Sequence, residues 1–178
     1  SLSITQRTSG FIDKMVELLN KKGIKTAVTG HDKFKNNVSE DEAKVVIEVR
    51  VPAQVDDAAG KTEASTVLEK EDTIAIYGSN EFAAKAIINA NGGFKESKLG
   101  ADKILAVGFD SGALQQDAIR KGIFVGSVTQ DPVQIGYQAV KLAIAAAKGE
   151  TVKDVDTGSK WYDAKNIDSE EIKALLYE

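Results

Sequence analysis

The sequence of 178 residues contains no cysteine and a single histidine, His31. Without cysteine the chain forms no disulfide bond and offers no thiolate nucleophile. The absence fits a secreted protein, although many cytosolic proteins lack cysteine too. His31 lies in a polar stretch, so a histidine-based triad or metal site has only one, poorly placed candidate. The sequence therefore predicts no metal site.

Long apolar runs and basic clusters are also missing. No stretch approaches the roughly 18 apolar residues that cross a bilayer. The chain opens with Ser1-Leu2-Ser3, which has neither the basic flank nor the apolar core of a signal peptide. We expect either a cytosolic protein or the mature or trimmed form of a secreted one. The net charge of −4, without a basic run, predicts no nucleic acid partner and no anionic membrane surface.

Sequence motifs of common enzymes are absent as well. The chain has neither the glycine-rich turn of dinucleotide-binding folds nor a P-loop, and it lacks the GxSxG turn of hydrolases. Asp56 and Asp57 form a carboxylate pair, but their place at a predicted helix start favours helix capping. We therefore predict that the protein is not an enzyme and has no catalytic residue and no cofactor.

What the chain does contain is a regular alternation of strand and helix patterns. Hydrophobic residues make up 42% and charged residues 28%, a balance typical of one large or two small globular domains. Strands are predicted at 45–51, 73–77, 103–107 and 123–128, and helices at 8–22, 57–70, 81–90 and from Asp131-Pro132 to 148. Strands that are apolar on both faces and alternate with helices indicate a parallel sheet covered by helices. The fold class is α/β.

Polar side chains follow three of these strands. Asn80, Asp110 and Gln130 each come just after a predicted strand, and ligands of open parallel sheets bind at the carboxyl ends of the strands. Amide and carboxylate groups suit a polyhydroxyl ligand, because each sugar hydroxyl both donates and accepts hydrogen bonds. The alternative is that these side chains cap helices, which is routine for asparagine and aspartate.

Three short motifs occur in order along the chain: IYGSNEFAA at 76–84, VGFD at 107–110 and TQDPVQIG at 129–136. Together they resemble the second half of the ribose- and galactose-type periplasmic binding proteins, whose fold is shared by the ligand-sensing cores of lac-repressor-like regulators. The segment Gln6–Phe11 resembles the start of that family's carboxy-terminal lobe. The resemblance covers residues 5–19 and most of the chain from about residue 45 onward.

The resemblance implies a three-layer, mostly parallel, Rossmann-like lobe, with the family's first lobe missing. It divides the chain into a ligand-binding lobe, 1–130, with an unaligned insertion at 22–44, and a hinge and return segment, 131–178. This second segment would pack on the absent lobe. Helix 131–147 would then expose its apolar stripe, so we expect it to fold back, to form a homodimer or to be supported by a swapped arrangement.

The resemblance also implies roles for four residues. Arg7 would donate to sugar oxygens, Asn80 would bind hydroxyls, Asp110 would accept from a pair of hydroxyls, and Gln130 would contact the ligand near the hinge. The sequence departs from the family at Val55, where an aromatic residue often stacks on the sugar. Because part of such a site lies on the other lobe, we expect millimolar or weaker binding by this chain alone.

The function that the resemblance implies is the solute-binding component of an ABC importer. Such a protein is extracytoplasmic, binds a small sugar or polyol between two lobes, and delivers it to the transporter permease. The alternative is the ligand-sensing core of a lac-repressor-like transcription regulator. The tail 156–168 resembles the closing strand and helix of transporter receptors and favours the first reading. The sequence does not identify the sugar.

Overall fold

The structure is a computed structural model that describes residues 1–177. The chain forms two compact units, Ser1–Glu63 and Ala64–Glu178, which we call unit 1 and unit 2. The predicted boundary at residue 130 falls inside unit 2. The division of the chain into a ligand-binding lobe and a return segment stays a prediction.

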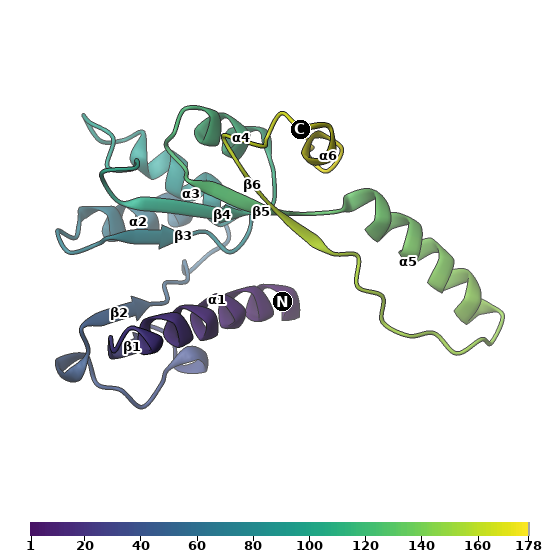
Figure 1. The fold of residues 1–178 in the computed structure, drawn as a ribbon, viewed down its shortest axis with the longest axis horizontal. Coiled ribbons are helices and arrows are strands. Elements are labelled where there is room, and N and C mark those ends of the chain that lie inside the picture. The colour runs from purple at the N-terminus through teal and green to yellow at the C-terminus, as the bar shows by residue number, and fades with distance from the viewer. Residues whose placement is uncertain (178) are drawn as a thin grey trace. The chain divides into compact units, whose positions relative to one another are not determined.

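Unit 1 consists of one long helix and a small parallel sheet (Figure 1). Helix α1, Leu2–Lys21, begins earlier than the predicted start at residue 8, because the Ser1 side chain caps its first turn. Strands β1, Thr26–Thr29, and β2, Val45–Glu48, pair in parallel. The core of this unit holds Ile12, Ala27 and Val28.

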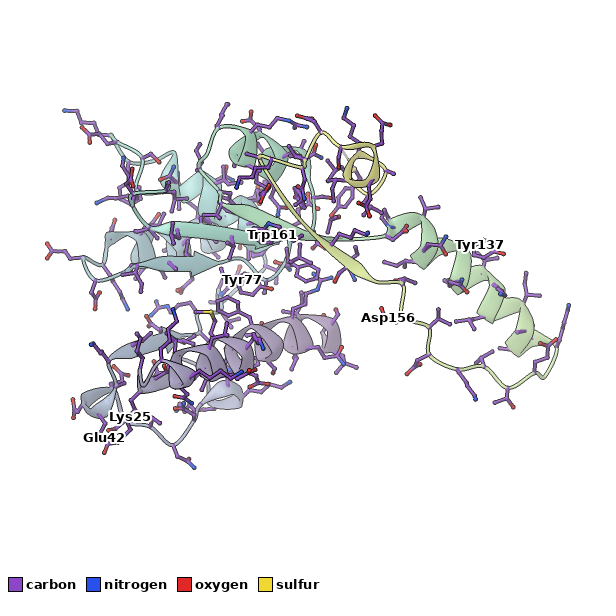
Figure 2. All side chains as sticks on the ribbon, viewed as in Figure 1. Lys25, Glu42, Tyr77, Tyr137, Asp156 and Trp161 are labelled. Atoms are coloured by element: carbon purple, nitrogen blue, oxygen red, sulfur yellow. The ribbon has the colours of Figure 1, made fainter. Side chains whose placement is uncertain are left out.

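The polar stretch between β1 and β2 contains two short 3-10 turns, Asp32–Phe34 and Glu40–Glu42. Asn36 fixes this stretch to β1, since its side chain accepts from Val28 N at 3.1 Å and donates to Thr26 O at 3.0 Å. An ion pair of 3.1 Å joins Lys25, just before β1, to Glu42 near the end of the stretch (Figure 2). The polar stretch is thus ordered by hydrogen bonds to the strand it follows.

Helix α2, Asp57–Glu69, begins at the carboxylate pair noted in the sequence. Asp56 Oδ1 accepts from Ala59 N at 2.8 Å, which confirms the capping interpretation. Ala64 and Leu68 on its second half are buried in the core of unit 2.

Unit 2 is built on a four-stranded sheet in the order β3-β4-β5-β6. The strands are β3, Ala75–Tyr77, β4, Leu105–Phe109, β5, Gly126–Gln130, and β6, Ser159–Asp163. The first three are parallel, and β6 is antiparallel to β5. The predicted mostly parallel α/β fold is confirmed. Strands β4 and β5 both lie further along the chain than the sequence pattern indicated.

One face of this sheet carries the core. Ala106 on β4, Ser127 and Thr129 on β5 and Tyr162 on β6 are fully buried. Helices α3, Glu81–Asn91, α4, Ala113–Arg120, and α6, Glu170–Lys173, contribute the apolar side chains that pack in the same cluster. The closing strand and the short helix, which we expected to pack on a lobe outside the chain, therefore help to build the core of unit 2.

Helix α5, Pro132–Ala147, differs from the others. Asp131 caps it by accepting from Gln134 N at 2.8 Å, with proline in its first turn, as the sequence predicts. None of its residues is buried. Figure 1 shows α5 extending away from the sheet of unit 2, between β5 and the segment that returns to β6. Its apolar stripe is exposed, and within residues 1–177 the helix does not fold back onto a core.

Candidate functional site

Three of the four predicted ligand-binding residues lie at one edge of the unit 2 sheet. Asn80 follows β3, Asp110 directly follows β4, and Gln130 is the last residue of β5. Because β3, β4 and β5 are parallel neighbours in that order, their carboxyl ends meet at the same edge, with Asp110 on the middle strand. All three side chains are partly buried. We call this edge the carboxyl edge.

Asn80 caps helix α3 from this edge. Its Oδ1 accepts from Ala83 N at 2.9 Å, so the capping alternative raised from the sequence is correct for this residue. Within residues 1–177 its Nδ2 makes no hydrogen bond, which leaves the amide as a donor toward the carboxyl edge. Gly78 makes this tight strand-to-helix turn possible, because a Cβ there would lie 2.7 Å from Ala84 N.

Asp110 is tied to the same turn. Its Oδ2 accepts from Glu81 N at 3.1 Å, which places the carboxylate at the amino terminus of α3. Its backbone has a φ of 77°, in the left-handed region. A negative charge is favourable at this end of a helix, where main-chain N–H groups lack intrahelical partners. The structure therefore brings Asn80 and Asp110 together.

The Asp110 carbonyl oxygen is surrounded by buried donors. It accepts from Tyr162 Oη at 2.8 Å, from Ser127 Oγ at 2.9 Å and from Gln115 Nε2 at 3.3 Å. Burial raises the pKa of Tyr162 to about 12, so this phenol is neutral and can donate throughout the physiological range. We call these three side chains the Asp110 cradle.

The end of the described chain closes over the same edge. Leu175 O accepts from Ser111 Oγ at 3.5 Å and from Thr129 Oγ1 at 3.3 Å. Tyr177 Oη donates to Glu81 Oε2 at 3.2 Å, and burial raises the pKa of this phenol. Nothing in the sequence pattern singles out Tyr177, because 96 residues separate it from Glu81.

Gln130 and Arg7 do not take part in the contacts that join Asn80 and Asp110 to the start of α3. Gln130 lies opposite Ser159 of β6 and leads directly into Asp131, the cap of α5. Arg7 lies on α1 in unit 1 and is partly buried. That Arg7 and Gln130 act with Asn80 and Asp110 on one ligand stays a prediction.

The residues that could have formed a metal site are the acidic side chains and His31. In the part of the chain that the structure describes, no group of three or more acidic or histidine side chains could hold a metal ion. His31 Nδ1 accepts from Lys33 N at 3.2 Å and so caps a 3-10 turn. Across residues 1–177 no helix has the length and apolar character needed to traverse a membrane.

Unit 1 contains a groove of about 370 Å³. It is lined by residues between Ile12 and Asn36, so it includes none of the four predicted ligand-binding residues. It runs beside α1, and its polar groups already bind protein: Glu17 pairs with Lys14 and Lys21, and Asn36 binds β1. We assign no site to this groove.

Comparison with known protein families identifies the family of this chain. The model of the periplasmic binding protein domain matches residues 5–151. The chain belongs to the periplasmic binding protein family. The resemblance drawn from the three sequence motifs is thereby confirmed.

Solved structures of this family share the fold. A protein from Brachyspira murdochii, described as an ABC transporter, LacI family transcriptional regulator, is 35% identical over 97% of this chain and 65% of its own, with a TM-score of 0.73. An ABC transporter solute binding protein from Agrobacterium vitis with bound D-fucose is 24% identical over 97% and 62%, with a TM-score of 0.70. A carbohydrate transporter solute binding protein from Agrobacterium radiobacter, in complex with D-arabinose, is 19% identical over 99% and 63%, with a TM-score of 0.63.

The chain spans less than two thirds of the length of these solved relatives. No curated protein matches it. What the family comparison establishes is therefore a periplasmic-binding-protein fold, and the two Agrobacterium relatives with this fold are described as solute binding proteins.

Proposed function

We propose that this chain is part of the sugar-binding component of an ABC importer and that it binds a small sugar or polyol at the carboxyl edge. The observation that carries the proposal is the pairing of Asn80 with Asp110 through the amino terminus of α3. One group offers amide donors and the other a carboxylate acceptor, which together match adjacent sugar hydroxyls.

Each predicted site residue has a separate role in this proposal. Asp110 accepts from two neighbouring hydroxyls, Asn80 donates to ligand oxygens, Gln130 contacts the ligand next to the start of α5, and Arg7 donates to sugar oxygens. No chemical step is proposed, because binding and release suffice for delivery to a permease. The protein would act outside the cytoplasm, where such receptors meet their ligands, and would bind no nucleic acid.

In this proposal residues 131–178 act as the hinge and return segment. Its helix α5 buries no residue and exposes Val133, Tyr137, Val140 and Ile144. Figure 2 shows Tyr137 on this helix, well away from the sheet. A helix that is apolar on most of its surface needs a partner. A homodimer through α5 is the partner that we test below.

Sugar binding is tested by titrating the protein with four compounds that are bound in solved structures of relatives: D-fucose, D-tagatose, D-arabinose and myo-inositol. The proposal expects saturable binding of at least one of them, and loss of that binding in an Asp110→Ala variant. Equal, non-saturating responses to all four compounds in both proteins would contradict it.

A second candidate is the ligand-sensing part of a transcription regulator. The description of the Brachyspira murdochii relative, 35% identical, favours it, since that protein is described with both roles. Deleting the gene separates the two functions. Loss of uptake of the radiolabelled sugar, with unchanged transcription of neighbouring genes, supports the importer. Changed transcription with normal uptake supports the regulator.

A further inference from the structure

Asp110 adopts a backbone conformation that is uncommon for residues other than glycine, although aspartate and asparagine tolerate it better than most. Among residues 1–177 it is the only non-glycine residue with a positive φ, 77°. Left-handed conformations are costly for residues with a Cβ and persist only where the surrounding structure enforces them. Other contacts of this residue must therefore supply the energy that holds it.

Three side chains from three different elements converge on the Asp110 carbonyl oxygen. Tyr162 lies on β6, Ser127 on β5 and Gln115 on α4, and all three are at most 1% exposed. The Tyr162 hydrogen bond is the shortest of the three, 2.8 Å. On the other side of the residue, Asp110 N donates to Val128 O at 2.7 Å. The main-chain groups of Asp110 are thus held on both sides.

The pairing of β5 with β6 explains why two hydroxyls meet at one oxygen. Ser127 and Tyr162 are direct partners in the antiparallel register, so their side chains lie on the same, buried face of the sheet. Gly108 on β4 leaves room for the third donor, because a Cβ there would lie 2.8 Å from Gln115 Nε2. The cradle is therefore built into the sheet and does not depend on loop conformation.

The backbone conformation of Asp110 determines where its carboxylate lies. The Asp110 carboxylate reaches Glu81 N only from the backbone conformation that the cradle enforces. If φ relaxed to a negative value, the Cβ would point elsewhere, and the link between the β4 and β3 ends would be lost.

We propose that Tyr162 is a positioning residue: its hydroxyl, donating to the Asp110 carbonyl oxygen, holds Asp110 in the left-handed conformation and so aims the Asp110 carboxylate at the carboxyl edge. The part of this inference that concerns ligand affinity rests on the proposed function. The part that concerns the conformation of Asp110 does not.

Tyr162→Phe tests the proposal, because it removes the hydroxyl and keeps the ring in the core. Ile172→Val is the matched control, because Ile172 is 3% exposed in the same core cluster, and its side chain has no hydrogen-bonding group to remove. Ser127→Ala removes a second donor from the same oxygen and shows whether the rest of the cradle shares the role of Tyr162.

Two measurements are made on each variant of the 178-residue chain. The first is the intraresidue NOE between the amide and α protons of Asp110, which is strong at positive φ because the two protons are close. The second is the dissociation constant for D-fucose, D-tagatose, D-arabinose and myo-inositol. We expect Tyr162→Phe and Ser127→Ala to weaken the NOE, to shift the Glu81 amide resonance and to weaken binding about three- to tenfold. Ile172→Val should change none of these.

The outcomes are separable. An unchanged NOE and an unchanged affinity in Tyr162→Phe overturn the proposal. A loss of affinity of the same size in Ile172→Val shows a general effect of core stability and also overturns it. If the unaltered chain binds none of the four compounds, the proposed function fails, and the NOE alone decides whether Tyr162 positions Asp110.

Discussion

The main-chain nitrogen of Glu81 donates a hydrogen bond of 3.1 Å to Oδ2 of Asp110, although 29 residues separate them in the sequence. This bond joins the carboxyl ends of β3 and β4. It places a carboxylate acceptor beside the Asn80 amide at the amino end of α3, where negative charge is favourable. Sugar recognition in this account depends on that pair.

The charge of Asp110 is the first quantity to test. Asn tolerates the left-handed region and keeps an oxygen for Glu81 N, so Asp110→Asn should fold normally. It loses the charge, and hydrogen bonds to charged groups contribute about 1.5–3 kcal/mol, which predicts roughly 10- to 150-fold weaker sugar binding. Calorimetry measures the affinity, and circular dichroism checks the fold. Unchanged affinity would remove Asp110 from the site.

Substitutions of Asn80 separate capping from ligand binding. Asn80→Asp retains the α3 cap, whereas Asn80→Ala loses it and should lower the free energy of unfolding by about 1 kcal/mol. Both lose the amide donor, and the new carboxylate of Asn80→Asp would also repel Asp110. We therefore expect both variants to bind sugar poorly and only the alanine variant to unfold at lower urea concentration. Normal binding by Asn80→Asp would show that the residue serves as a cap alone.

The buried phenol of Tyr162 predicts an alkaline loss of stability. Its pKa rises from 10.0 to about 12 on folding because burial disfavours the charged form. The folded state thus holds the proton more tightly than the unfolded state. The stability that this provides is complete below pH 10 and is lost as the pH rises toward 12, by up to roughly 2.7 kcal/mol.

Urea unfolding of the unaltered chain and of Tyr162→Phe, measured between pH 9 and the alkaline limit of reversibility, checks this prediction. Because both proteins share their other titrating groups, the difference between their free energies of unfolding isolates Tyr162. We expect that difference to shrink as the pH rises. A difference independent of pH would mean that Tyr162 ionises in the folded protein as it does in water.

Local patterns predicted most of the elements of the fold. The Asp131-Pro132 start of α5 and the alternation of strands with helices appear in the structure as expected, because caps and hydrophobic periodicity are short-range properties. The start of α1 was predicted too late, although Ile4, seven residues before Phe11, continues the apolar stripe into the first turn. Strands β4 and β5 were placed too early in the chain, since the apolar residues Ile104, Ile123 and Phe124 just before them also pack in the core and extend the apolar pattern.

The carboxyl-edge residues could be predicted from parallel topology, whereas their supporting contacts could not. That Asn80 and Asp110 share an edge follows from neighbouring parallel strands. The contact of Tyr162 with Asp110 spans 52 residues and depends on the register of β6 against β5. Of the two aromatic residues on β6, Tyr162 packs in the core, while Trp161 is 43% exposed and covers Gly126 (Figure 2).

The exposed apolar side chains of helix α5 lead us to predict self-association. Val140 is 62% exposed, and each large apolar side chain left in water forgoes about 1.5–3 kcal/mol of burial. If α5 forms a homodimer, Val140→Lys should shift the monomer–dimer equilibrium toward monomer, and Gln134→Lys, an exposed polar position on the same helix, should change it little. Sedimentation equilibrium measures both. A chain that is monomeric at high concentration before any substitution contradicts the dimer.

The most direct test of the account is a two-dimensional ¹H–¹⁵N NMR titration of the 178-residue chain with D-fucose, D-tagatose, D-arabinose and myo-inositol. The account predicts that at least one of them produces saturable shifts, greatest at the amides of Asn80, Glu81, Asp110 and Gln130. Shifts confined to other parts of the chain, or no saturable shift with any of the four, would contradict a sugar site at the carboxyl edge.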